Sequence, residues 1–195
     1  MTDGKFVFDG AGDYIDSGNT ADALSSMTVA FRMKPSTQSS TYRDVIGKWG
    51  SSNYGWWVEI PDTAATKLAF GTSGRNYAQT TNSVVTKDVW NHITIVHDNN
   101  GTANYIYVNG VSAALTDTFG GPGVIGASTA VLSIGGNPLA SRFFTGELDD
   151  TRILSCALTA AEVLRHYSLG AGAAYQVDRR VKYKAAAVGH TMQMV

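Results

Sequence analysis

The sequence contains one cysteine, Cys156, so the chain cannot form an internal disulfide. We expect this side chain to pack rather than react, because no candidate base lies near it in the sequence. The Gly-x-Ser-x-Gly motif of serine hydrolases is missing as well. The residues therefore give no support to nucleophilic catalysis by cysteine or serine.

Long apolar runs and a strong net charge are also missing. No stretch approaches the roughly 18 consecutive apolar residues of a membrane-spanning helix, and the N-terminal sequence MTDGKFVFDG lacks the pattern of a signal peptide. We therefore expect a piece of a longer protein, or a chain that leaves the cell by another route. The net charge of −1 gives no reason to expect a nucleic-acid partner.

The abundant residues favour an all-β protein. The 195 residues include 21 glycines, and 44% of the chain is hydrophobic, which indicates many turns around one core. About a dozen short segments alternate between apolar and polar residues, and Asn109-Gly110 is a strong hairpin signal. The pattern predicts an antiparallel β-sandwich of two sheets.

The last predicted strand requires an irregularity. Leu148 and Ile153 are five residues apart and so lie on opposite faces of a regular strand. Both can point into the core only if a bulge intervenes, and the Asp149-Asp150 pair occupies the place where it is needed.

A short helix should follow this strand. Thr159 and Glu162 have the spacing of a capping box, and Gly170 is a natural stop. The side chains that we expect this helix to bury are Leu158, Val163, Leu164 and Tyr167.

Residues 171–195 differ in composition from the rest of the chain. They contain four basic residues and one acidic residue, a net charge of +3, so residues 1–170 carry −4. Such a segment is either a solvated tail or an arm held by a partner, because ordering costs about 1–2 kcal/mol per residue. We predict a domain over 1–170 and an arm that binds a protein partner or a second copy. The residues predicted to make this contact are Tyr175, Val177, Arg179, Arg180, Val181, Lys182, Tyr183 and Lys184.

Four segments of the sequence resemble a known family in their order along the chain. They are FDGAGDYIDSG (8–18), MTVAFRMKP (27–35), WNHITIVHD with YIYVNG (90–110), and LSIGG followed by FTGELDDTRILSCALTAAEV (to 163). Over about residues 5–170 the chain resembles the laminin-G-like, or concanavalin A-like lectin/glucanase, jelly roll. The resemblance implies the jelly-roll form of the sandwich. It is less informative on function, since this fold hosts lectins, glycosidases, adhesion modules and virion parts.

The resemblance also allows a catalytic hypothesis to be examined. Glucanases of this fold carry a Glu-x-Asp-x-Glu strand, whose two glutamates act as nucleophile and acid/base. The matching segment here begins at Glu147, but Thr151 occupies the second position. Because threonine cannot replace a carboxylic acid as proton donor, we predict that the protein is not an enzyme.

Calcium is the cofactor that the sequence could accommodate. The ion takes six to eight oxygen ligands, often from turns, and relatives of this fold often bind it near loops. The candidate ligands are Asp9, Asp13, Asp149 and Asp150. The alternative is that these aspartates only cap turns through their own hydrogen bonds.

A glycan site would need flat aromatic faces with polar partners at the rim. Trp57 is the central candidate, because its parity is opposite to that of the core-facing Trp56 and Val58, and Glu59 shares its face. The full candidate set is Trp49, Tyr54, Trp57, Arg75, Asn76, Tyr77 and Arg142. Aromatic residues on both faces are also ordinary in a two-sheet sandwich, so packing is the alternative.

Two functions fit these features. The first is a non-enzymatic surface component of a phage-like virion, such as a decoration, tail or adhesion protein, anchored by its arm and able to bind surface glycans. The second is a carbohydrate-binding module of a secreted or larger glycan-active protein. Both place the protein on a virion surface or outside the cell, without insertion into a membrane.

Overall fold

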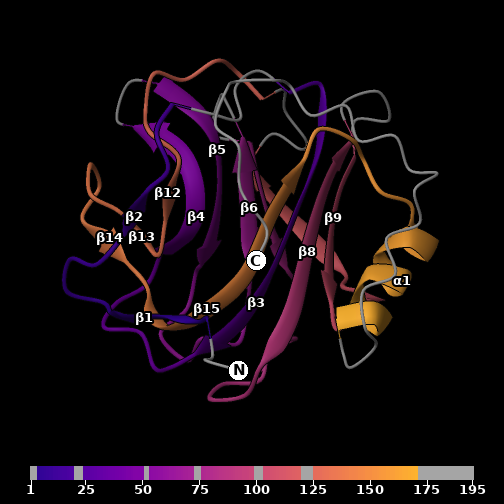
Figure 1. Cartoon of the computed structure of the whole chain (residues 1–195), viewed down its shortest axis with the longest axis horizontal. Helices are drawn as coiled ribbons and strands as arrows, with labels where there is room; N and C mark the ends of the chain where they lie inside the picture. Colours follow the sequence, from indigo (N-terminus) through magenta and orange to yellow (C-terminus); the bar gives the residue numbers. More distant parts are fainter. Residues whose placement is uncertain are drawn as a thin grey trace.

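The computed structural model describes residues 4–19, 24–50, 53–72, 76–98, 103–119 and 125–170, and it forms an antiparallel sandwich of two large sheets (Figure 1). Sheet A contains, in spatial order, β1 (Phe6–Asp9), β15 (Thr145–Leu154), β3 (Ser26–Pro35), β8 (Asn91–Asp98), β9 (Ala103–Val108) and β10 (Val111–Ser112). Sheet B contains β11 (Leu115–Phe119), β7 (Asn76–Thr80), β6 (Ala69–Thr72), β5 (Asn53–Ile60), β4 (Arg43–Gly50), β12 (Ser133–Ile134) and β2 (Ile15–Asp16). A separate hairpin pairs β13 (Gly136–Asn137) with β14 (Arg142–Phe143). The two-sheet sandwich predicted from the sequence is confirmed.

The core lies between the sheets and follows the alternation of the strands. In β3, Val29, Phe31 and Met33 are at most 1% exposed, and in β5 Trp56 and Val58 are fully buried. Because side chains alternate along a strand, the residues between them emerge on the outer faces. Those outer faces carry the features that distinguish this chain.

The predicted bulge is present in β15. Asp149 pairs with Arg32 and Arg152 pairs with Ala30. Between these two pairs β15 therefore contains one residue more than β3. Asp150 absorbs the irregularity with a φ of 51°. As a result Leu148, on one side of the bulge, and Ile153, on the other, both reach the main core.

The Asn109-Gly110 hairpin is confirmed as well. Both residues have positive φ, 52° and 78°, as a tight turn between β9 and β10 requires. The amide of Asn109 donates to the carbonyl of His92, and the Asn109 side chain accepts from the amide of the same residue. The turn is thereby tied to β8 and to the outer face of sheet A.

The helix α1 (Ala160–Gly170) begins with the predicted capping box. The amide and hydroxyl of Thr159 both donate to Glu162 Oε2 at 2.8 Å, and the amide of Glu162 donates back to the Thr159 hydroxyl at 3.3 Å. These hydrogen bonds lower the pKa of Glu162 and keep it ionised near the positive end of the helix.

The helix lies against the outer face of sheet A, beside β8 and β9 (Figure 1). Val163 is fully buried against Val96 and Tyr107, with Leu158 partly buried beside them. The predicted burial of Leu164 is wrong, since its side chain is 52% exposed. Leu164 lies over Gly110, at the turn that ends the sheet, so about half of it stays in solvent.

Cys156 is exposed, which corrects the expectation that it packs. Partial burial of the thiol and the charge of Glu162 raise its pKa, which favours the unreactive protonated form. No helix among the described residues has the length and apolar character needed to cross a membrane. The predicted arm, residues 171–195, lies outside the described residues.

Candidate functional site

Four of the residues predicted for a glycan site come together on the outer face of sheet B. They are Trp49, Trp57, Tyr77 and Arg142. Across β5, β6 and β7 the register sets Trp57 opposite Gly71, and Gly71 opposite Tyr77. A Cβ atom at Gly71 would collide with the indole of Trp57, so the glycine makes the space in which this ring lies flat on the sheet.

Beneath these rings lies a pair of carboxylates. Asp44 on β4 and Glu59 on β5 face each other in the register and are 2% and 1% exposed. Burial of two acids side by side is costly unless a cation or hydrogen bonds compensate. The rest of the cluster supplies both.

Arg142 is the cation that bridges the pair. Its Nη1 lies 3.0 Å from Glu59 Oε2 and 3.8 Å from Asp44 Oδ1. The same guanidinium stacks on two aromatic rings, 5.2 Å from the centroid of Trp49 and 5.7 Å from that of Tyr42. The short β13–β14 hairpin therefore positions Arg142 over sheet B, within reach of both carboxylates.

Trp49 is fixed from several sides. Its indole Nε1 donates to Asp44 Oδ2 at 2.7 Å, and its ring lies 5.3 Å from that of Trp57. The side-chain amide of Asn137 donates to the backbone carbonyl of Trp49 at 3.3 Å. These contacts hold the ring in one orientation next to Arg142.

The electrostatics of the cluster favour protonation of one acid. Burial, reinforced by the negative charge of Glu59, raises the pKa of Asp44 to about 7, although Arg142 and Trp49 act in the opposite direction. Burial also raises the pKa of Glu59, against hydrogen bonding from Tyr77, Trp57 and Arg142. Both carboxyls are therefore easier to protonate than free acids, and the guanidinium of Arg142 is the cation that opposes this effect in each of them.

The cluster has a buried floor and an open rim. Trp57, Asp44 and Glu59 form the floor, while Tyr42 is 49% exposed and the Arg142 side chain is 33% exposed. Tyr42 has a φ of 57°, a conformation that a bulky residue adopts only where the surroundings impose it. We call Tyr42, Trp49 and Arg142, which lie above this floor and are less buried than it, the aromatic rim.

The aromatic rim offers the exposed Tyr42 and the partly exposed guanidinium of Arg142 to the solvent, with the half-buried Trp49 beside them. Flat aromatic surface packs against the apolar face of a planar or cyclic ligand, and guanidinium and carboxylate groups bond hydroxyls at its edge. The arrangement is suited to binding and contains no pair of exposed acids flanking a cleft.

Only part of this cluster was predicted from the sequence. Trp57 lies on the predicted face, but it is 7% exposed and supports the floor instead of offering a stacking surface. Arg75 and the side chains of Tyr54 and Asn76 lie outside the described residues.

Three members of the cluster were missed, namely Tyr42, Asp44 and Asn137, and Glu59 was placed on the face of Trp57 without being included among the candidates. One signal was available for the acids. Gly50 pairs with Asn53, and counting back along both strands from this pair brings Asp44 opposite Glu59, because the two register shifts between them cancel. No local pattern indicates that the distant β13–β14 hairpin folds over them.

The candidate calcium ligands form two separate pairs. Asp9 pairs with Thr145 at one end of the β1–β15 ladder, whereas Asp149 lies beyond its other end. Asp9 Oδ1 accepts the amide of Ala11 at 2.7 Å, and Asp13 Oδ2 accepts the amide of Asp9 at 3.3 Å, which is the turn-capping alternative.

The second pair has cationic partners. Asp150 lies 2.6 Å from Arg152 and Asp149 lies 3.7 Å from Arg32. Among the residues that the structure describes, no three His, Cys, Asp or Glu side chains form a group that could hold a metal ion. Calcium at these aspartates stays a prediction from the sequence.

The segment that resembles the glucanase motif has a structural role in sheet A. Glu147 bridges Lys5 at 2.8 Å and Lys34 at 3.3 Å, and the hydrogen bond from Lys5 lowers its pKa the most. Thr151 lies in the bulge. The carboxylate is therefore held ionised between two lysines, unlike a proton-donating acid.

Comparison with known proteins agrees with this fold. The sequence profile of the concanavalin A-like lectin/glucanases superfamily matches residues 9–164. No curated protein matches the sequence. Among solved structures, the chain is similar to a heptameric SAP-like pentraxin from Limulus polyphemus, with a TM-score of 0.62, 19% identity, and coverage of 82% of this chain and 79% of the pentraxin.

Two further structures come from bacteria. A putative carbohydrate-binding protein from Bacteroides ovatus gives a TM-score of 0.59 at 21% identity, covering 78% of this chain and 44% of that protein. The binding domain of Paraclostridial Mosquitocidal Protein 1 gives a TM-score of 0.58 at 14% identity, covering 85% of this chain and 45% of that protein. The chain spans less than half of each of these two, and at such identities the likeness concerns the fold.

Proposed function

We propose that this chain, which belongs to the concanavalin A-like lectin/glucanases superfamily, is a non-enzymatic protein that binds a glycan at the aromatic rim over sheet B. The observation that carries the proposal is the convergence of Tyr42, Trp49 and Arg142 above the buried Asp44–Glu59 pair. The carbohydrate-binding description of the similar Bacteroides ovatus structure supports the same class of ligand.

The chemistry of the rim fits a sugar ring better than a charged small molecule. Arg142 is already neutralised by Glu59 and Asp44, so the site carries no surplus positive charge for an anion. The remaining donors of a guanidinium that is fixed on two rings can bond neutral hydroxyls, while the exposed Tyr42 ring packs against the C–H face of the sugar. A site held in place before the ligand arrives loses little entropy on binding.

A glycan array with paired variants tests this function. Tyr42→Ala removes the exposed ring and should weaken binding at least about tenfold, the equivalent of roughly 1.4 kcal/mol. Tyr14→Ala is the matched control, because Tyr14 is similarly exposed, at 41%, outside the rim. Trp57→Ala is less informative, since it removes a buried ring and endangers the fold.

Two results would contradict the proposal. One is the absence of any glycan bound by the wild-type chain. The other is equal weakening by Tyr42→Ala and Tyr14→Ala, which would show that the rim is not the binding surface.

The role of a phage-like virion surface component extends this proposal. Its support is the opposite charge of the two parts of the sequence, +3 in residues 171–195 and −4 in residues 1–170. An arm with alternating Val177, Val181 and Tyr183 among basic residues is suited to adding along the sheet edge of a neighbour. In this role the chain is displayed on a particle, and glycan binding serves attachment.

Truncation separates the anchored role from a free carbohydrate-binding module. A chain of residues 1–170 should fold, keep its glycan affinity and no longer join its particle, as measured by co-sedimentation. Unchanged incorporation of the truncated chain into particles would remove the arm from the proposal and leave the module.

A further inference from the structure

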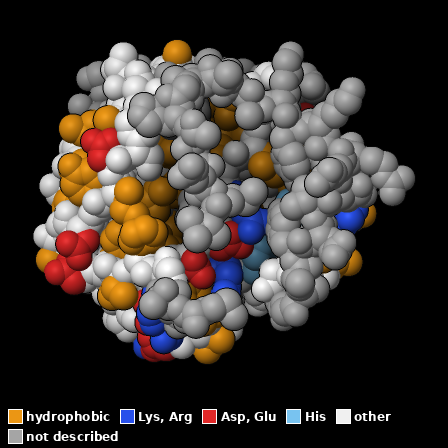
Figure 2. Space-filling model, in the orientation of Figure 1, with side chains coloured by type: hydrophobic (Ala, Val, Ile, Leu, Met, Phe, Trp, Pro, Cys, Tyr) orange, Lys and Arg blue, Asp and Glu red, His pale blue; other side chains and the backbone are white. Residues whose placement is uncertain are grey.

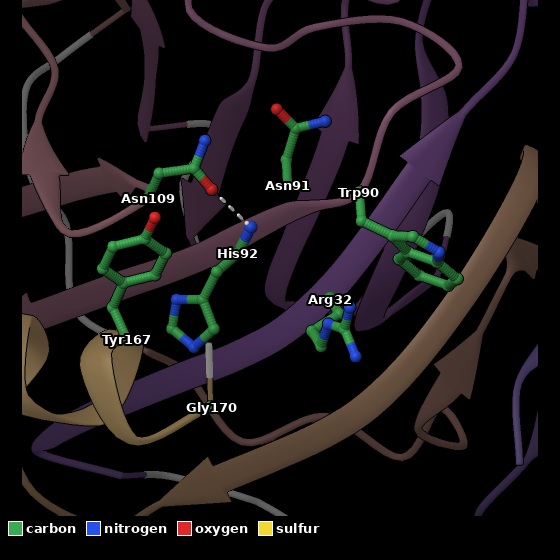
Figure 3. A pocket seen from close by; sticks show the side chains of 7 residues that line it. All are labelled: Arg32, Trp90, Asn91, His92, Asn109, Tyr167 and Gly170. Carbon is green, nitrogen blue, oxygen red and sulfur yellow. Dashed lines mark hydrogen bonds between the residues drawn. The ribbon is translucent and has the colours of Figure 1, made fainter. Parts of the chain in front are cut away.

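A pocket lies on the opposite side of the molecule from the aromatic rim, on the outer face of sheet A where α1 ends (Figure 3). The residues that line it and matter here are Arg32, Trp90, His92, Asn109, Tyr167 and Gly170. Figure 3 shows Arg32 between Trp90 on one side and the His92–Tyr167 pair on the other. None of these residues belongs to the site proposed above.

The register of the strands builds the floor of this pocket. Arg32 on β3 pairs with Asp149 on β15 and with His92 on β8, so the three side chains form a row across the sheet. Asn109 continues the row, because its side chain accepts the amide of His92 at 2.9 Å. Trp90 precedes His92 by two residues, and because side chains alternate along an extended chain, both lie on the same face.

The walls of the pocket are aromatic. The Arg32 guanidinium lies 5.0 Å from the centroid of the Trp90 ring. On the other side, the rings of His92 and Tyr167 are 5.7 Å apart, so α1 closes the pocket with Tyr167. The helix has thus a second role besides covering Val96 and Tyr107.

Arg32 is poorly satisfied for a guanidinium. Within the described part of the chain it donates no hydrogen bond, and its one ion pair, with Asp149 Oδ2, is long at 3.7 Å. Arg152, by contrast, is held by Asp150, with its Nε donating at 2.9 Å and its Nη2 at 2.6 Å. The planar donor fork of Arg32 is therefore the one available to a ligand on this face.

The other groups around Arg32 add no positive charge to the pocket, and one of them is an acid. Burial lowers the pKa of His92, so its ring is neutral near pH 7, and Nδ1 of this ring has no hydrogen-bond partner among the described residues. Figure 2 shows Lys and Arg, Asp and Glu, and His side chains gathered where β15, β3 and β8 lie. Asp149 is the one acid in contact with Arg32, and it sets the repulsion that an anion must overcome.

We propose that this pocket is a second ligand site, which takes the carboxylate of an acidic sugar residue. The carboxylate meets the fork of Arg32 in the two-point geometry that planar carboxylates and guanidiniums share. The sugar ring lies between Trp90 and Tyr167, and Asn109 provides an amide at the edge. The site is independent of the aromatic rim, where the guanidinium of Arg142 already contacts two carboxylates, at 3.0 Å and 3.8 Å.

Titration of the full chain with D-glucuronate, followed by NMR, tests this inference. We expect shifts at the Trp90 indole N–H and the Asn109 side-chain amide, with affinity at least about tenfold above that for D-glucose. Arg32→Gln should remove this difference. Asp149→Asn should tighten binding about threefold, because it removes repulsion while its amide oxygen still accepts the Asp150 amide.

Lys34→Gln is the matched control for Arg32→Gln. Lys34 lies on the same face of the same strand, carries the same charge and pairs with Glu147 outside the pocket. Equal weakening by both variants, or equal affinity for glucuronate and glucose, would overturn the carboxylate site. Shifts confined to Trp49 and Trp57 would also overturn it while supporting the glycan site at the aromatic rim.

Discussion

Asp44 and Glu59 face each other across β4 and β5 with almost no exposure to solvent, 2% and 1%. The pair makes stability depend on pH. The pKa of Asp44 rises from 3.8 to about 7 on folding, so the native chain holds a proton that the unfolded chain would release. The contribution of Asp44 is complete below pH 3.8 and is lost as the pH rises toward 7.

Asp44→Asn should therefore remove a decline in stability between about pH 4 and 7. The difference in free energy of unfolding between wild type and variant should change by at most about 1.4 kcal/mol per pH unit. Urea unfolding at several pH values measures it. Glu147→Gln is a control of opposite sign, because the lowered pKa of Glu147 gives a contribution that is lost as the pH falls below 4.5. Parallel wild-type and Asp44→Asn curves would contradict this reading of the pair.

Gly71 should not tolerate a side chain. A Cβ atom there would collide with the six-membered ring of Trp57, which is packed between Gly71 and Trp49. We expect Gly71→Ala to cost about 1–3 kcal/mol of stability and to weaken ligand binding at the rim. Gly4→Ala, at a position with open space around it, should have almost no effect on thermal unfolding. Similar melting temperatures for both variants would show that the Trp57 ring can move.

The bulge depends on a residue that accepts positive φ. Asp150→Val should destabilise the chain by about 1–2 kcal/mol, since a β-branched residue fits poorly at a φ of 51°. Asp150→Asn keeps a residue that tolerates this conformation and loses only the half-exposed ion pair with Arg152, so its cost should be below about 1 kcal/mol. Equal costs in chemical denaturation would assign the role of Asp150 to its charge.

The capping box should stabilise α1 and with it the Tyr167 wall of the pocket. Thr159→Ala removes the hydroxyl that exchanges hydrogen bonds with Glu162 and should cost about 1 kcal/mol. Amide exchange in α1 should accelerate, whereas Thr159→Ser should preserve protection. If glucuronate binding survives complete fraying of the helix, Tyr167 is not part of the site.

Short-range sequence patterns were sufficient to predict many of the structural elements of this protein. Alternation identified the core face of β5, Asn109-Gly110 identified a hairpin, and Thr159 with Glu162 identified the start of α1. The parity of Leu148 and Ile153 required the bulge before any partner strand was known. These features depend on a few neighbouring residues, and the chemistry of those residues is enough to decide them.

The two sites were decided by contacts between distant parts of the chain. Sequence parity put Trp57 and Glu59 on one face, but only the fold of the β13–β14 hairpin brought Arg142 to them and showed Trp57 to be buried. The pocket needed the pairing of β15, β3 and β8 to place Asp149, Arg32 and His92 in one row, and α1 to add Tyr167. The sequence by itself determined which faces are apolar and where the chain turns. Tertiary structure decided on which outer face each polar side chain lies and which side chains become its neighbours. The reason is that strand order and register depend on packing over the whole core.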